Sequence, residues 1–205
     1  MEFIKIKDIE IFTLSNSEKI FEYNIIDWHD YFKEKNPIIV EIGCGNGHFL
    51  INEALNNKNF NYIGIDIKKD RILKCNKKQK DNNLKNILWI NGEAFLVLSH
   101  LFEDSSIHKI YMTFPDPWPK RRAHKKRLFN ENFLTLVLKK LENNGEFFFI
   151  SDFEDYYKWC IRILENNNIN YFHYNESKIE KFQRSLFAEK WKKENRIFYH
   201  FAFLK

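Results

Sequence analysis

An acidic residue and a tryptophan stand between prolines in the segment Phe114-Pro-Asp-Pro-Trp-Pro-Lys120. Proline fixes its own φ and excludes the preceding residue from the helical region, so the alternating prolines predict a stiff, extended loop that holds Asp116 and Trp118. The loop follows an apolar run, Ile110 to Phe114, that is typical of a buried strand. A carboxylate and an indole are therefore expected at a fixed position at the end of a strand.

A run of cations follows this loop within eight positions: Lys120, Arg121, Arg122, Lys125, Lys126 and Arg127. The chain has a net charge of +5, so everything outside this run sums to −1. A basic excess confined to one segment is typical of a surface that binds a polyanion, where Lys and Arg contact phosphates without reading sequence. The competing interpretation is a solvated loop, which is the usual fate of a charge run. The rigid acid and indole beside it favour chemistry on a nucleic acid.

The second motif is Glu41-Ile-Gly-Cys-Gly-Asn-Gly47, which ends a β-branched run and precedes a predicted helix, His48 to Asn57. A strand, a glycine turn and a helix in this order open nucleotide-binding α/β folds. Glycine allows a sharp turn with a ligand lying against the backbone, and amides at the helix start donate to that ligand. Three glycines are candidates for this role: Gly43, Gly45 and Gly47. The alternative is an ordinary turn between a strand and a helix.

Two further acids stand where strands are predicted to end. Asp66 closes the run Asn61 to Asp66, 19 residues after Gly47, and is placed to accept hydrogen bonds from both hydroxyls of a ribose. Glu93 follows the run Ile87 to Asn91, a place where adenine edges are read in such folds. Each acid also has a structural interpretation, Asp66 as a helix cap and Glu93 as an acid stabilising the start of a helix.

Five such strand–helix repeats predict the fold. The length of 205 residues and an apolar content of 44% suit a single domain, residues 1–205, in which residues 1–36 form an N-terminal arm and a covering helix, Ile20 to Phe32. Two late runs, Tyr171 to Tyr174 and Arg196 to Phe203, are expected to pair antiparallel. We therefore expect an α/β, Rossmann-like, doubly wound and mostly parallel seven-stranded sheet with an antiparallel C-terminal edge hairpin.

The composition also bears on where the protein acts and which partners it can have. The three cysteines are scattered, which favours a reducing compartment, and the chain start lacks a signal-peptide core, so we expect a cytoplasmic protein. No apolar run approaches the length of a membrane span, and the histidines lack the spacing of a metal site, so neither a membrane nor a metal is expected as a partner. The sequence leaves open whether the protein is a monomer or a homodimer.

The motif from Glu41 to Gly47, with Asp66 after it, resembles the cofactor motif of Rossmann-like S-adenosylmethionine methyltransferases. The loop from Phe114 to Lys120 and its basic tail resemble the signature of the bacterial tRNA (guanine-N7-)-methyltransferase family. The resemblance covers about residues 36–205. It implies S-adenosyl-L-methionine as the cofactor and tRNA as the partner. The reaction it implies is methylation of guanine N7 at position 46, in the variable loop.

The resemblance also implies roles for single residues. The cofactor site would be lined by Glu41, Asp66, Glu93 and Asp116, and Asp116 would also be the active-site residue. Substrate contacts would come from Lys120, Asp152, Ser177, Lys178, Ile179 and Glu180. This sequence departs from the family pattern at Ser177, where Thr is usual, at Ile179, where an aromatic residue is usual, and at Ala123.

Other functions suit part of the sequence. An NAD-dependent oxidoreductase would use the glycine turn and Asp66, but it does not explain the acid between prolines or the cations. A catalytically silent RNA-binding module would keep the fold, although the intact set of Glu41, Asp66 and Asp116 argues against it. A small-molecule methyltransferase leaves the cations without a purpose. Trp118 has two interpretations, stacking on a base or anchoring the loop.

Overall fold

The computed structural model of the chain describes residues 2–6, 9–13, 25–175, 179 and 197–205. Within them, one sheet runs in the order β1-β2-β5-β4-β3-β6-β7-β8. Its strands are β1 (Glu2–Ile6), β2 (Ile9–Thr13), β3 (Ile38–Ile42), β4 (Asn61–Asp66), β5 (Ile87–Asn91), β6 (Ile107–Thr113), β7 (Leu141–Ser151) and β8 (Tyr199–Leu204). The helices are α1 (His48–Asn56), α2 (Lys69–Asp81), α3 (Ala94–Leu101), α4 (Glu131–Lys140) and α5 (Glu154–Asn166), with short 3-10 turns η1 (Trp28–Tyr31) and η2 (Arg121–Lys126).

The centre of the sheet is parallel and buried on both faces. Every residue of β3 and β4 is buried, as expected for strands that read as continuous apolar runs. β4 and β5 lie on one side of β3 and β6 and β7 lie on the other, so the winding reverses between β3 and β6. Ligands of open α/β sheets bind beyond the carboxyl ends of the strands at such a reversal. The predicted doubly wound, mostly parallel α/β sheet is therefore confirmed.

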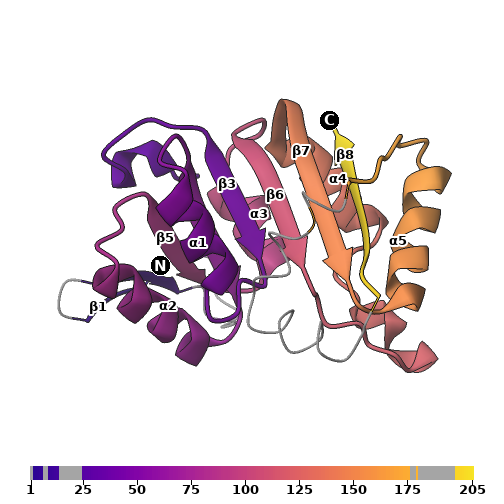
Figure 1. Cartoon of the computed structure of the whole chain (residues 1–205), viewed down its shortest axis with the longest axis horizontal. Coiled ribbons are helices and arrows are strands. Elements are labelled where there is room, and N and C mark those ends of the chain that lie inside the picture. The colour runs from indigo at the N-terminus through magenta and orange to yellow at the C-terminus, as the bar shows by residue number, and fades with distance from the viewer. Residues whose placement is uncertain (1, 7–8, 14–24, 176–178, 180–196) are drawn as a thin grey trace.

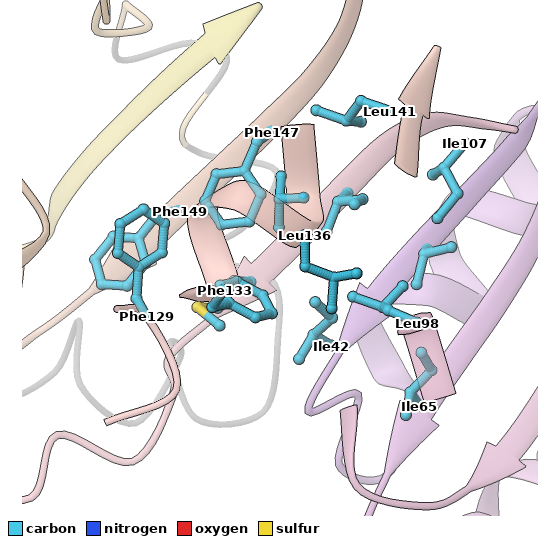
Figure 2. Packing of buried hydrophobic residues seen from close by; sticks show 14 of the residues in the cluster. Ile42, Ile65, Leu98, Ile107, Phe129, Phe133, Leu136, Leu141, Phe147 and Phe149 are labelled. Atoms are coloured by element: carbon cyan, nitrogen blue, oxygen red, sulfur yellow. The ribbon is translucent and has the colours of Figure 1, made fainter. Parts of the chain in front are cut away.

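Two apolar layers attach helices to the sheet. α1 and α2 cover one face through side chains such as Phe49, Leu50 and Ile72, and they lie in front of the sheet in Figure 1. α3, α4 and α5 cover the other face, where phenylalanines fill the core (Figure 2). The Phe129 ring lies 5.5 Å from that of Phe147 and 6.0 Å from that of Phe133, within the range of favourable aromatic pairs.

The edges of the sheet differ from the prediction. The sheet of the described residues has eight strands, because the N-terminal segment supplies β1 and β2, so the count of seven is wrong. β8 is the expected antiparallel edge strand, but it pairs with β7, and the run from Tyr171 to Tyr174 contributes a single bridge, Phe172 to Ala202, in place of a hairpin strand. Apolar alternation identifies a strand but does not identify its partner.

The N-terminal covering helix is also not found as predicted. Residues 14–24 of that region lie outside the described residues, and the described part forms the short turn η1. Trp28 anchors this turn, because its buried indole Nε1 donates to the Leu101 carbonyl at 3.1 Å. None of the described helices combines the length and the apolar character needed to span a lipid bilayer.

Candidate functional site

A pocket of about 290 Å³ opens at the carboxyl ends of β3, β4, β5 and β6. It brings together predicted site residues that are distant in the sequence, namely Gly43, Asp66, Glu93, Asp116 and Lys126. Its other walls are Ile42, Ile65, Ile67, Lys68, Arg71, Gly92, Ala94, Met112, Phe114, Pro115, Trp118, Leu128 and Tyr156. The glycine turn and the proline loop therefore share one cavity, as the two sequence motifs required.

The glycine turn is fixed by Asp66. The backbone N–H of Gly45 donates to Asp66 Oδ2 at 2.9 Å, and the N–H of Lys68 donates to Oδ1 at 2.8 Å. Arg71 Nη1 lies 3.5 Å from Oδ2, and the Asp66 residue is only 5% exposed. The carboxylate thus ties the turn to the start of α2, which is the structural interpretation of this acid. A carboxylate has about four acceptor sites, so capacity for ligand hydroxyls remains.

The glycines have different reasons to be glycine. Gly43, Gly45 and Gly47 all have positive φ, at 71°, 55° and 73°, a region that other residues rarely adopt. A Cβ on Gly43 would meet no atom within 4 Å, and Gly43 lines the pocket. A Cβ on Gly47 would lie 2.7 Å from the Trp89 ring and 2.8 Å from Cys75 Sγ. Gly47 is therefore required by packing against α2 and β5, and Gly43 faces the ligand space.

Glu41 is a buried acid next to the site, and its carboxyl pKa is strongly raised. It is 2% exposed, and Thr113 Oγ1 donates to its Oε1 at 2.7 Å, while Oε2 is buried without a partner in the described structure. Burial raises the pKa of Glu41 to about 8, and nearby Asp66 and Glu53 add to the rise. Glu41 does not line the pocket itself but precedes Gly43, which does, by two residues. A buried carboxyl with a free oxygen is a candidate partner for a cationic ligand group.

Glu93 has the structural role that the sequence left open. Its carboxylate caps α3, accepting from the backbone N–H groups of Phe95 and Leu96, each at 3.0 Å. The residue also lines the pocket, so a ligand contact remains a prediction.

The proline loop carries an exposed Asp116 into the pocket. The sequence predicted an extended loop, but the backbone departs from this at two residues: Phe114 and Trp118 have φ values of 48° and 45°. Both residues precede prolines, which disfavour the right-handed helical region, and bulky residues at positive φ are strained. Such strain persists where surrounding structure enforces it, and it is common at functional sites.

Arg127 is the residue that holds this loop, and its predicted phosphate contact is wrong. Its side chain is fully buried, and its Nε donates to the Pro117 carbonyl at 2.9 Å. Its Nη2 donates to Asp155 Oδ2 at 2.5 Å, and its guanidinium carbon lies 4.9 Å from the Tyr156 ring centre. This hydrogen bond lowers the pKa of Asp155. A buried guanidinium is not accessible to phosphate; it clamps the residue next to Asp116 onto α5.

The other cations of the run remain on the surface. Lys120, Arg121, Arg122, Lys125 and Lys126 are exposed on or beside η2, a turn that the sequence did not predict. Lys126 Nζ lies 4.6 Å above the Trp118 ring, and both residues line the pocket. Trp118 thus contacts the loop's own basic tail and is also available at the pocket wall.

Two further predicted contacts, Asp152 and Ile179, do not line the pocket. Asp152 is partly buried just after β7. Ile179 is 6% exposed and belongs to the core cluster on the α1 and α2 face, so its side chain is not available to a substrate. Ser177, Lys178 and Glu180 lie outside the described residues.

Sequence reasoning missed the apolar walls of the pocket and the basic residues of its α2 side. Ile42, Ile65 and Met112 read only as buried strand residues, because a run of apolar letters does not indicate which end is open. Lys68 and Arg71 line the pocket directly after Asp66. Because they directly follow a candidate ribose-binding acid in the sequence, they could have been predicted to line the pocket.

The chain is similar to known methyltransferases in sequence. A family model described as "Putative methyltransferase" matches residues 35–200. The chain is 37% identical over 146 residues to the tRNA (guanine-N(7)-)-methyltransferase of Buchnera aphidicola subsp. Baizongia pistaciae, covering 71% of this chain and 60% of that protein. It is 33% identical over 155 residues to the protein of the same name from Francisella philomiragia, covering 74% and 68%. The chain spans 55–65% of the length of four such curated relatives.

Among solved structures, a 16S rRNA methyltransferase, KamB, superposes with a TM-score of 0.64 at 9% identity, covering 88% of this chain and 94% of that chain. This likeness concerns the fold alone, which is the Rossmann-like methyltransferase fold. From the family model and the relatives, the chain belongs to the family of S-adenosylmethionine-dependent tRNA (guanine-N7)-methyltransferases.

Proposed function

We propose that this protein transfers a methyl group from S-adenosylmethionine to N7 of a guanine in tRNA, the variable-loop guanine at position 46. The observation that carries the proposal is the shared pocket. Asp116 from the proline loop lines the same cavity as Gly43 and Asp66 from the cofactor motif, and exposed cations lie at its border. A tRNA substrate would place the activity in the cytoplasm, with residues 1–205 acting as one domain in a monomer or a homodimer.

The residues around the pocket fit S-adenosylmethionine. Apolar walls at Ile42, Ile65 and Met112 suit a purine and a thioether-like chain, and Asp66 keeps acceptor capacity for ribose hydroxyls. The unpartnered Oε2 of Glu41 suits an ammonium group, which would favour the ionised carboxylate over the protonated form. When bound, S-adenosylmethionine supplies an electrophilic methyl group on a sulfonium. Gly43, Asp66, Glu93 and Glu41 would hold it.

The target atom sets modest chemical demands on the protein. Guanine N7 has an in-plane lone pair, so no proton has to leave before it attacks, and we assign no general base. The protein has to orient the purine and stabilise the positive charge that develops on its imidazole ring. Asp116 supplies a carboxylate on a clamped loop for both tasks, and it accepts hydrogen bonds from the donor edge of guanine in this proposal.

The exposed cations on and beside η2 would bind tRNA phosphates. They are Lys120, Arg121, Arg122, Lys125 and Lys126, without the buried Arg127. Phosphate contacts position a nucleic acid without specifying sequence, so choice of the guanine rests on the pocket.

A methyl-transfer assay on unmodified tRNA with labelled S-adenosylmethionine tests the proposal. We expect labelled tRNA from the unaltered protein and a large loss with Asp116→Ala. Binding of tRNA without any methyl transfer would instead support the catalytically silent RNA-binding module. Membership in a methyltransferase family removes the NAD-dependent oxidoreductase as a candidate.

A further inference from the structure

A second basic segment borders the pocket, on and around α2. The stretch from Ile67 to Lys80 has seven Lys and Arg residues and one Asp, a net charge of +6. This equals the charge of the run from Lys120 to Arg127, and the rest of the chain then carries −7. These two segments together carry +12, and the rest of the chain sums to a negative charge.

The two basic segments meet at the same cavity. Lys68 and Arg71 line the pocket from the α2 side, and Lys126 lines it from the η2 side. α2 begins just after the carboxyl end of β4 and lies at the lower edge of Figure 1, toward which the arrows of β3 and β6 point. An anionic polymer seated over the opening would therefore meet cations on both sides.

Part of the α2 charge is committed to the fold. Arg71 pairs with Asp66, and Lys78 Nζ donates to the Asn46 carbonyl at 2.8 Å. Lys78 is partly buried against the glycine turn, and this burial lowers its pKa.

We define the α2 basic surface by four of the exposed lysines of this segment: Lys68, Lys69, Lys74 and Lys77. In the described part of the chain, the one ion pair that reaches this surface is Lys74 with Asp70, at 3.9 Å. Both partners are more than 60% exposed, so the pair contributes little and competes weakly with a phosphate.

We propose that the α2 basic surface binds phosphates of the same tRNA that η2 contacts, so that the target nucleotide is held over the pocket between two anchored stretches of backbone. This inference rests on the proposed function. The helix of 13 residues is about 20 Å long, which is enough to follow several successive phosphates. The alternative is a solvated, lysine-rich helix in a chain rich in lysine.

The test uses three charge-neutralising variants of the full chain. The α2 variant combines Lys69→Gln, Lys74→Gln and Lys77→Gln, and spares Lys68 because it lines the pocket. The η2 variant combines Arg121→Gln, Arg122→Gln and Lys125→Gln. The matched control removes three exposed lysines near the amino ends of the strands: Lys33→Gln, Lys35→Gln and Lys85→Gln.

The affinity for unmodified tRNA is measured against salt concentration, with thermal unfolding to check the fold. Each lost phosphate contact lowers the salt slope by roughly 0.7–0.9. We expect the α2 variant to lose about two units of slope and at least about tenfold in affinity at low salt, with additive loss when combined with the η2 variant. The control should keep the slope of the unaltered protein.

Two failures are distinguishable. Equal slopes for the α2 variant and the control would overturn the α2 surface. Lack of methyl transfer by the unaltered protein would contradict the proposed function. The binding measurement does not depend on turnover, so it would still test the α2 basic surface.

Discussion

The glycine turn and the proline loop form two walls of one pocket, but they are held by different means. The glycine turn is held by a buried acid, Asp66, which accepts a hydrogen bond from the Gly45 backbone N–H, and a second buried acid, Glu41, lies just before the turn. The proline loop presents an exposed acid, Asp116, on a strained backbone that Arg127 fixes from behind. We infer that the first wall is built to hold a small ligand and the second to meet a large one arriving from solvent.

The largest effect is expected at the exposed acid. Asp116→Ala should lower the turnover of tRNA methylation by about 100-fold or more, because a fixed carboxylate no longer faces the developing charge. Affinity for S-adenosylmethionine, measured by calorimetry, should fall much less. Asp116→Asn is the matched control, since it keeps the shape and removes the charge. Turnover of Asp116→Ala at the level of the unaltered protein would remove Asp116 from the mechanism.

Breaking the clamp should also reduce turnover, by acting through the loop. Arg127→Leu loses the bonds to Pro117 and Asp155, and we expect turnover to fall about tenfold or more and unfolding free energy to fall by about 2–3 kcal/mol, measured in urea. Asp155 is 54% exposed, so it is not stranded as a buried charge. Arg127→Lys should recover part of the stability but little turnover, because it cannot reproduce the planar contacts. If kcat stays constant and only stability falls, the loop is not positioned by Arg127.

The buried acid Glu41 should make the stability of the fold depend on pH. Because the folded protein keeps a proton on Glu41 up to a pKa of about 8, against an ordinary value of 4.5, this group stabilises the fold at low pH. Its contribution is lost as pH rises between these values, with a slope of up to about 1.4 kcal/mol per pH unit. Glu41→Gln should remove that slope in denaturant titrations and weaken S-adenosylmethionine binding about tenfold at pH 8. An unchanged pH dependence in the variant would contradict the assignment of this proton.

The smallest effects on turnover are expected at the glycines, whose variants should separate packing from ligand binding. Gly47→Ala should lower unfolding free energy by about 2–3 kcal/mol, because its Cβ meets Trp89 and Cys75 in a left-handed conformation. Gly43→Ala has open space, so its cost should be nearer 1 kcal/mol, while its affinity for S-adenosylmethionine should fall more than that of Gly47→Ala. Chemical denaturation ranks the two variants by stability, and calorimetry ranks them by affinity for S-adenosylmethionine. If both rankings were reversed, Gly43, and not Gly47, would be the packing glycine.

How far the sequence reaches depends on the kind of interaction. Asp66 can be identified from the sequence because an acid about 20 residues past a glycine turn falls at the carboxyl end of the next parallel strand, beside that turn. Arg127 was assigned to phosphate because a sequence shows charge but not burial, and its partner Asp155 lies 28 positions away. The left-handed backbone of Trp118 was missed because proline excludes one region of φ and ψ without selecting among the others.

The edges of the sheet show the same limit. The central strands were located because burial on both faces leaves an unbroken apolar run, as in β3 and β4. The partner of β8 and the two N-terminal strands depend on long-range pairing, which a local pattern does not encode.

The most direct test is to locate the methyl group. Unmodified tRNA is incubated with the full chain and S-adenosylmethionine, digested with a base-specific nuclease and mapped by mass spectrometry, with tRNA lacking guanine at position 46 as the control. We expect one methyl group on N7 of guanine 46, and none in the control tRNA or with Asp116→Ala. Methylation of another base, or of both tRNAs alike, would contradict a pocket built around Asp116 for that guanine.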